Sequence, residues 1–181
     1  LYMQAITTVV HKPMERPLLT PDTFSGFSLG LSSCRPTSRG IIEIRSANPF
    51  EQPKITANAY STATDVQEML EGTRIIRRIA AQEPLASLIA EEMMPGPSCV
   101  SDKDVINDFR QRSSTIYHPV STCRMGPSPS ASVVDSTLRV HGVQNLRVCD
   151  ASIFPNLISG NTNAASMMVG WKGAEIILGA R

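Results

Sequence analysis

Short apolar stretches alternate with polar, proline-rich breaks along the first sixty residues of the chain. In the clearest stretch, Ile42 and Ile44 fall on one face of an extended chain and Glu43 and Arg45 on the other. β-branched and alternating residues predict strands at 4–10, 24–32, 41–46 and 54–58. Turn residues at 35–40 and 48–53 separate the last three. This part of the sequence therefore predicts an antiparallel sheet.

Helical spacing replaces alternation after residue 60. Apolar positions recur every three or four residues. Ser61 or Thr62 is a suitable N-cap for the first helix, and Ser101 is one for a later helix. Pro84 can begin a further helix, which Pro95 would end. The predicted helices span about 63–82, 85–93, 102–112 and 163–178. Strands followed by helices predict an α+β fold, with an antiparallel sheet covered by helices.

Composition and charge exclude several classes of protein. The 181 residues carry a net charge of +1 without a basic run, which disfavours a nucleic-acid surface. No apolar stretch approaches the roughly 20 residues that span a bilayer. The four cysteines are scattered, which predicts free thiols and a cytoplasmic location. His11 and His141 lack partners at metal-ligand spacing, so no metal site is expected.

Chemistry-bearing residues gather in the last third of the chain. Taken alone, His118 can be structural, a proton acceptor, or the base of a Cys–His pair with Cys123. Asn161 can cap the last helix or hydrogen-bond a substrate, and Asp150 can cap its own turn. The three segments that hold them are Tyr-His-Pro-Val-Ser-Thr-Cys-Arg-Met-Gly (117–126), Leu-Arg-Val-Cys-Asp-Ala-Ser-Ile-Phe-Pro (146–155) and Ser-Gly-Asn-Thr-Asn-Ala (159–164).

In this order, the three segments resemble the C-terminal part of the glucose–methanol–choline (GMC) family of flavin-dependent alcohol oxidoreductases. The resemblance covers essentially the whole chain and is most specific over 114–181. It implies FAD as cofactor and a small-molecule alcohol as substrate. It also implies a substrate-binding domain over 1–112. Residues 113–181 would then form the C-terminal segment, or edge, of an FAD-binding α/β domain.

The resemblance also implies a role for each site residue. His118 would accept the hydroxyl proton of the substrate while hydride leaves the same carbon for flavin N5, and Asn161 would hydrogen-bond the substrate oxygen. Asp150 and Ala151 would approach the ribityl and pyrophosphate part of FAD. Residues 161–163 (Asn161, Thr162 and Asn163) would lie against the flavin ring, where a helix start favours negative charge. Many relatives carry glycine where this chain has Ser121, and serine would be strained there if φ were positive.

The chain lacks the glycine-rich turn of a dinucleotide-binding unit. We therefore expect a C-terminal portion that is inactive without an N-terminal FAD-binding portion of the same enzyme. Phe154, Leu157 and Ile158 are expected to pack against that portion. Two alternatives stay open: a binding or interaction module of the same descent without redox activity, and a Cys–His hydrolase. The sequence leaves the alcohol, and the choice between oxidase and dehydrogenase, undetermined.

Overall fold

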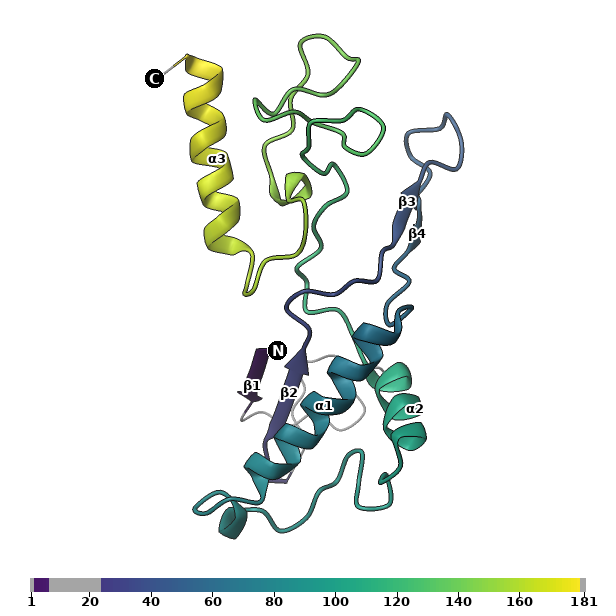
Figure 1. Ribbon diagram of the computed structural model, residues 1–181, viewed down its shortest axis with the longest axis vertical. Coiled ribbons are helices and arrows are strands. Elements are labelled where there is room, and N and C mark those ends of the chain that lie inside the picture. The colour runs from purple at the N-terminus through teal and green to yellow at the C-terminus, as the bar shows by residue number, and fades with distance from the viewer. Residues whose placement is uncertain (1, 7–23, 180–181) are drawn as a thin grey trace. The chain divides into compact units, whose positions relative to one another are not determined.

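The computed structural model describes residues 2–6 and 24–179, so the predicted strand residues 7–10 and His11 lie outside the described residues. The chain divides into two compact units. The first combines Leu1–Ser33 with Tyr60–Ser114, and the second combines Cys34–Ala59 with Thr115–Arg181 (Figure 1). Each unit has its own buried hydrophobic cluster. No helix in the described part of the chain is long and apolar enough to cross a membrane.

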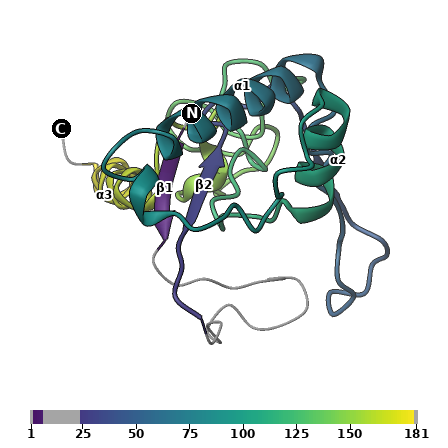
Figure 2. The same cartoon turned by 90° about the horizontal axis from the view of Figure 1, so that it is seen from below.

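The first unit places two helices beside a two-stranded sheet. Strands β1 (Tyr2–Ile6) and β2 (Ser28–Ser32) pair antiparallel. Helix α1 (Ala63–Ala80) contacts both β2 and helix α2 (Asp102–Arg112). Figure 2 shows α1 running across the two strands. The two predicted strands thus exist as an antiparallel pair, although β2 is shorter than predicted.

Local capping explains where both helices begin. Thr62 Oγ1 accepts a hydrogen bond from the backbone N–H of Asp65 at 3.3 Å. Ser101 and Asp104 form a reciprocal capping box at the start of α2. The hydrogen bond from the Ser101 hydroxyl lowers the pKa of the Asp104 carboxyl. These predicted helices are confirmed within two residues of their expected ends.

The predicted helix at 85–93 is wrong. The chain forms only a short 3₁₀ turn there, η1 (Ala86–Leu88). Leu88 is 74% exposed and Met93 is 47% exposed, so the apolar face that a helix would need to bury has no core to pack on. A helix this short is marginal without such burial.

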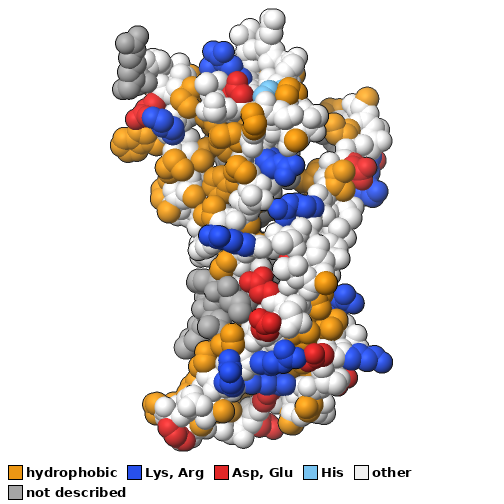
Figure 3. Space-filling view, in the orientation of Figure 1, with side chains coloured by type: hydrophobic (Ala, Val, Ile, Leu, Met, Phe, Trp, Pro, Cys, Tyr) orange, Lys and Arg blue, Asp and Glu red, His pale blue; other side chains and the backbone are white. Residues whose placement is uncertain are grey.

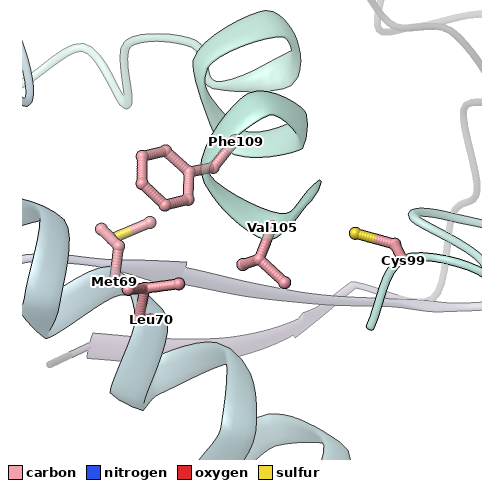
Figure 4. Packing of buried hydrophobic residues seen from close by; sticks show 5 residues of the cluster. All are labelled: Met69, Leu70, Cys99, Val105 and Phe109. Carbon is pink, nitrogen blue, oxygen red and sulfur yellow. The ribbon is translucent and has the colours of Figure 1, made fainter. Parts of the chain in front are cut away.

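The core of the first unit joins α1, α2 and the loop between them. Met69 and Leu70 from α1 face Val105 and Phe109 from α2, with Cys99 contributed by the loop (Figure 4). Burial raises the pKa of the Cys99 thiol. Arg77 of α1 fixes the same loop, because its guanidinium donates to the Glu92 carboxylate at 2.7 Å and to the carbonyl oxygen of Cys99 at 2.7 Å.

The second unit contains the other two predicted strands. β3 (Ile41–Glu43) and β4 (Lys54–Thr56) pair antiparallel, with Ile42 opposite Ile55. The described strands therefore form two separate two-stranded sheets rather than the single sheet that the sequence predicts. The reason is that the connection from β2 to β3 carries the chain from one compact unit into the other.

The rest of the second unit consists of loops, a 3₁₀ turn and one long helix. Residues 146–149 form no named strand and contribute an isolated antiparallel bridge between Arg139 and Arg147. Turn η2 (Ala151–Ile153) is followed by helix α3 (Asn163–Leu178), which begins and ends where the sequence predicts. The loops, η2 and α3 share one buried core, which consists of Val134, Leu138, Ile153, Phe154 and Val169.

The expectation that Phe154 packs against another portion of the enzyme is wrong. Its ring is only 7% exposed and lies in the core of the second unit, and Ile158 packs against the same cluster. Phe154 and Ile158 thus pack inward, in the cluster that also contains Val169 of α3, whereas the expected contact of the half-buried Leu157 stays a prediction. Overall, the chain has the α+β composition that its pattern predicts.

Candidate functional site

His118 lies in a loop with an uncommon backbone conformation. Tyr117, immediately before it, has φ of 62°, and Ser121, three residues after it, has φ of 71°. The Tyr117 N–H donates to Thr115 Oγ1 at 3.0 Å, which supports the turn. A non-glycine residue in the left-handed region costs roughly 1–2 kcal/mol. Two such residues around one imidazole mark a loop whose shape is imposed by its surroundings, as is common at functional sites.

Replacing Ser121 with glycine should stabilise the protein by about 0.5–1 kcal/mol, because glycine adopts positive φ without the steric cost. Ser121→Ala is the matched control, since alanine keeps the Cβ that causes the strain. Chemical denaturation of the two variants compares their free energies of unfolding. Equal stability of the glycine and alanine variants would contradict a strained Ser121.

The imidazole of His118 is hydrogen-bonded to the start of the last helix. Its Nδ1 lies 2.9 Å from Thr162 Oγ1, across 44 positions of sequence. His118 is half-buried, whereas Thr162 is 8% exposed. The contact engages Nδ1, and no hydrogen bond to Nε2 is found among the described residues. Nε2 is therefore the ring nitrogen that remains available for a further hydrogen bond.

Two arginines hold the loop that leads into the last helix. Arg39 Nη2 donates to Asn156 Oδ1 at 2.7 Å, and Arg35 Nε donates to Ser159 Oγ at 3.0 Å. Both side chains come from the turn that precedes β3, within the same compact unit. This bracing fixes the chain directly before Asn161, which is exposed. Because Thr162 touches His118, the loops around His118 and Asn161 lie side by side, but a shared contact with one substrate oxygen stays a prediction.

Asp150 caps the start of the 3₁₀ turn η2. Its Oδ1 accepts a hydrogen bond from the Ser152 N–H at 2.8 Å and begins η2. The carboxylate is exposed and Ala151 is half-buried. The turn-capping role is thus present, and an approach of Asp150 and Ala151 to a cofactor stays a prediction.

The start of α3 suits the polar edge of a flavin. Thr162 makes no side-chain cap hydrogen bond to the helix, because its hydroxyl contacts His118 instead. The amides of the first turn therefore lack this common acceptor and can donate to a ligand oxygen. Asn163 and Ala164 are exposed at this end, so neither bulk nor burial blocks access. These groups fit the carbonyl-bearing edge of a flavin ring, where negative charge develops on reduction.

Cys123 does not form the pair that a Cys–His hydrolase needs. Its backbone N–H donates to the Ser152 carbonyl oxygen at 2.9 Å, while the hydrogen-bonded partner of the His118 ring is Thr162. No hydrogen bond between Cys123 and His118 is found among the described residues. The contact between Thr162 and His118 was missed by sequence reasoning, which assigned Thr162 to the cofactor. No local pattern in the sequence links Thr162 to His118, which lies 44 positions away.

Comparison with known proteins assigns the family. The family model described as GMC oxidoreductase matches residues 36–170. The alcohol dehydrogenase [acceptor] of Pseudomonas putida is 46% identical over 153 residues, covering 84% of this chain and 28% of the relative. The mitochondrial choline dehydrogenase of Homo sapiens is 42% identical over 160 residues, covering 88% of this chain and 27% of the relative.

Solved structures give the same result. Pyridoxine 4-oxidase from Mesorbium loti has a TM-score of 0.81 and 32% identity, and the match covers 90% of this chain and 32% of that one. A formate oxidase has a TM-score of 0.80 and 31% identity, with coverage of 89% and 28%. The chain spans less than a third of the length of these relatives, in their C-terminal portion. Relatives in this family depend on FAD. With the motif, the fold and these matches in agreement, the chain belongs to the GMC oxidoreductase family of FAD-dependent enzymes.

Proposed function

We propose that this chain is the catalytic C-terminal portion of an FAD-dependent enzyme that oxidises a primary or secondary alcohol. The observation that carries the proposal is the hydrogen bond between His118 and Thr162, which holds an imidazole beside the start of α3 and leaves Nε2 without a hydrogen bond to any residue that the structure describes. Relatives named as alcohol and choline dehydrogenases support a small alcohol as the substrate.

The proposed reaction removes one proton and one hydride from the alcohol. His118 accepts the hydroxyl proton at Nε2, and the carbon–oxygen bond becomes a carbonyl. FAD, when bound, supplies the hydride acceptor at its N5. The Asn161 amide donates a hydrogen bond to the substrate oxygen, where negative charge grows as the proton leaves.

Cofactor contacts are proposed for two segments of the second unit. Residues 161–163 and the uncapped start of α3 would hold the flavin ring, and Asp150 with Ala151 would lie toward the ribityl and pyrophosphate part. In the intact enzyme, we assign 1–112 to a substrate-binding domain and 113–181 to the edge of the FAD-binding domain. The compact units group 34–59 with the second of these regions.

A substrate panel tests the proposed activity. The complete enzyme that contains this chain should bind FAD and turn over 1-butanol, choline or another small alcohol with an artificial electron acceptor. Each alcohol should yield the corresponding carbonyl compound. An enzyme that retains FAD but oxidises no alcohol in a broad panel would instead support the binding or interaction module.

An exposed apolar surface on α3 is proposed to contact the N-terminal FAD-binding portion. Met167, Met168 and Trp171 are 63%, 59% and 74% exposed. Hydrophobic side chains gather at the surface over this helix (Figure 3). Adjacent exposed apolar side chains of this size commonly mark a contact site. We therefore assign the contact with the N-terminal FAD-binding portion to this surface rather than to Phe154.

Association of the two portions should bury Trp171. Because Trp171 is the single tryptophan of the chain, its fluorescence reports directly on this surface. Mixing the chain with its FAD-binding portion should shift the emission to the blue and raise the melting temperature, since a partner that binds the folded form stabilises it. Met168→Glu should weaken the association, whereas Val143→Glu, on a half-exposed turn of the same unit, should not. Unchanged emission on mixing would contradict the proposed contact.

A further inference from the structure

We propose that Thr162 is the positioning residue of His118: its hydroxyl oxygen holds Nδ1 and so presents Nε2 to the alcohol. The inference rests on the proposed function, because it assigns a role only if His118 accepts a proton. It concerns a residue that touches the imidazole, not one that reacts.

Thr162 is anchored more firmly than its neighbours. It is 8% exposed, whereas Asn161 and Asn163 on either side of it are exposed. Its carbonyl oxygen accepts hydrogen bonds from both the N–H and the Oγ of Ser166, each at 2.8 Å. Threonine is also β-branched, which restricts its side-chain rotation. The hydroxyl is therefore fixed in place while the amides of the helix start stay available.

The His118 loop is fixed to the same core. Val120 packs against the cluster that contains Val169, which lies two turns further along α3 than Thr162. The left-handed Tyr117 and Ser121 set the path of the loop on either side. Both partners of the hydrogen bond are thus held by one packed unit, and the 2.9 Å contact needs no movement of either segment.

The contact matters because it decides which nitrogen carries the hydrogen. His118 can accept a proton at Nε2 only if its neutral ring carries the hydrogen on Nδ1, where it donates to Thr162 Oγ1. A hydroxyl can also donate to Nδ1, which would leave a hydrogen on Nε2 and block it. A substrate hydroxyl that donates to Nε2 selects the productive form. After proton transfer the imidazolium keeps the Nδ1–H bond to Thr162, so the ring need not rotate.

Three variants of the complete enzyme test the assignment. Thr162→Val keeps the shape but removes the hydroxyl, and it should lower kcat about tenfold, the effect of one lost hydrogen bond, with little change in KM. Thr162→Ser keeps the hydroxyl and should restore most of the rate. Thr137→Val is the matched control, because it removes a threonine hydroxyl that donates to the Asp135 carboxylate and does not contact the imidazole. The substrate is whichever of 1-butanol and choline is oxidised faster.

A second readout does not depend on turnover. In enzyme labelled with ¹⁵N-histidine and bound to trifluoroethanol, an alcohol that resists hydride loss, His118 should carry its hydrogen on Nδ1. The resonance is identified by its absence from the His118→Gln spectrum. This measurement on the wild-type sequence decides the assignment even if Thr162→Val fails to fold.

The outcomes separate the inference from the proposed function. Full kcat in Thr162→Val, or a hydrogen on Nε2 in the trifluoroethanol complex, would overturn the role of Thr162. If either of these results is found but His118→Ala is inactive, only the role of Thr162 fails, and the proposed function stands. If His118→Ala also keeps the wild-type rate, the proposed function itself fails.

Discussion

Replacing His118 with alanine should slow the reduction of FAD by an alcohol at least about 100-fold, the lower end of what general acid–base catalysis contributes. The imidazole is half-buried and fixed through Nδ1 to Thr162, so its other nitrogen is held in place to accept the hydroxyl proton. Alanine leaves the bound alcohol with no side chain at that position to accept its proton. Stopped-flow absorbance of the flavin measures the rate directly.

His141→Gln is the matched control for this experiment. His141 lies in the same unit, and its Nε2 contacts the Gly126 carbonyl oxygen at 3.1 Å and Ser132 Oγ at 3.2 Å. This is a structural position within the loop region, so its replacement should leave flavin reduction unchanged. A His118→Ala enzyme that reduces FAD at the wild-type rate would remove His118 from the mechanism.

Phe154→Ala should destabilise the protein by about 3–5 kcal/mol, the usual cost of deleting a buried ring. Phe154 is 7% exposed and lies among Val134, Leu138, Ile153 and Val169, so its removal leaves a cavity between η2 and α3. Since α3 begins at the candidate site, the same change should loosen the His118–Thr162 contact. Chemical denaturation monitored by circular dichroism measures the loss of stability.

Phe50→Ala makes the same substitution on a ring that is 89% exposed in the same unit. It should change the free energy of unfolding by no more than about 0.5 kcal/mol, as is usual for surface positions. Equal effects of the two substitutions would show that Phe154 is not part of the core.

The helices could be predicted because their signals are local. Thr62 and Ser101 cap α1 and α2 through hydrogen bonds to residues three positions away, and these pairs are visible in the sequence. The predicted helix near Leu88 failed because its apolar residues needed a core that the fold does not supply. Periodicity shows that a face is apolar, but not whether anything covers it.

Contacts between distant segments could not be predicted in the same way. Strand spacing indicated extended chain at 24–32 and 41–46, but not that β2 and β3 would enter different compact units. Phe154 looked like an exposed loop residue because its partners come from other segments, as far away as Val134 and Val169. Burial of this kind depends on the tertiary fold.

In the candidate site, too, local motifs could be predicted from the sequence and contacts between distant segments could not. The segment around His118 identified the family, and the comparisons confirm that assignment. The glycine that many relatives carry at the position of Ser121 left open whether φ is positive there, and the structure gives Ser121 a φ of 71°. The contact of Thr162 with the imidazole spans 44 positions and carries no sequence signature. Only the packing of both loops on one core brings the two side chains together.

The central claim is that this chain belongs to an enzyme that oxidises an alcohol by hydride transfer to FAD. Anaerobic mixing of the FAD-bound complete enzyme with an alcohol tests this claim most directly. The alcohol should bleach the visible absorbance of the flavin in a single phase, and the same alcohol deuterated at the hydroxyl-bearing carbon should bleach it more slowly, because that carbon–hydrogen bond breaks. FAD that stays oxidised in the presence of every alcohol tested, or that is reduced at the same rate by both isotopic forms, would contradict it.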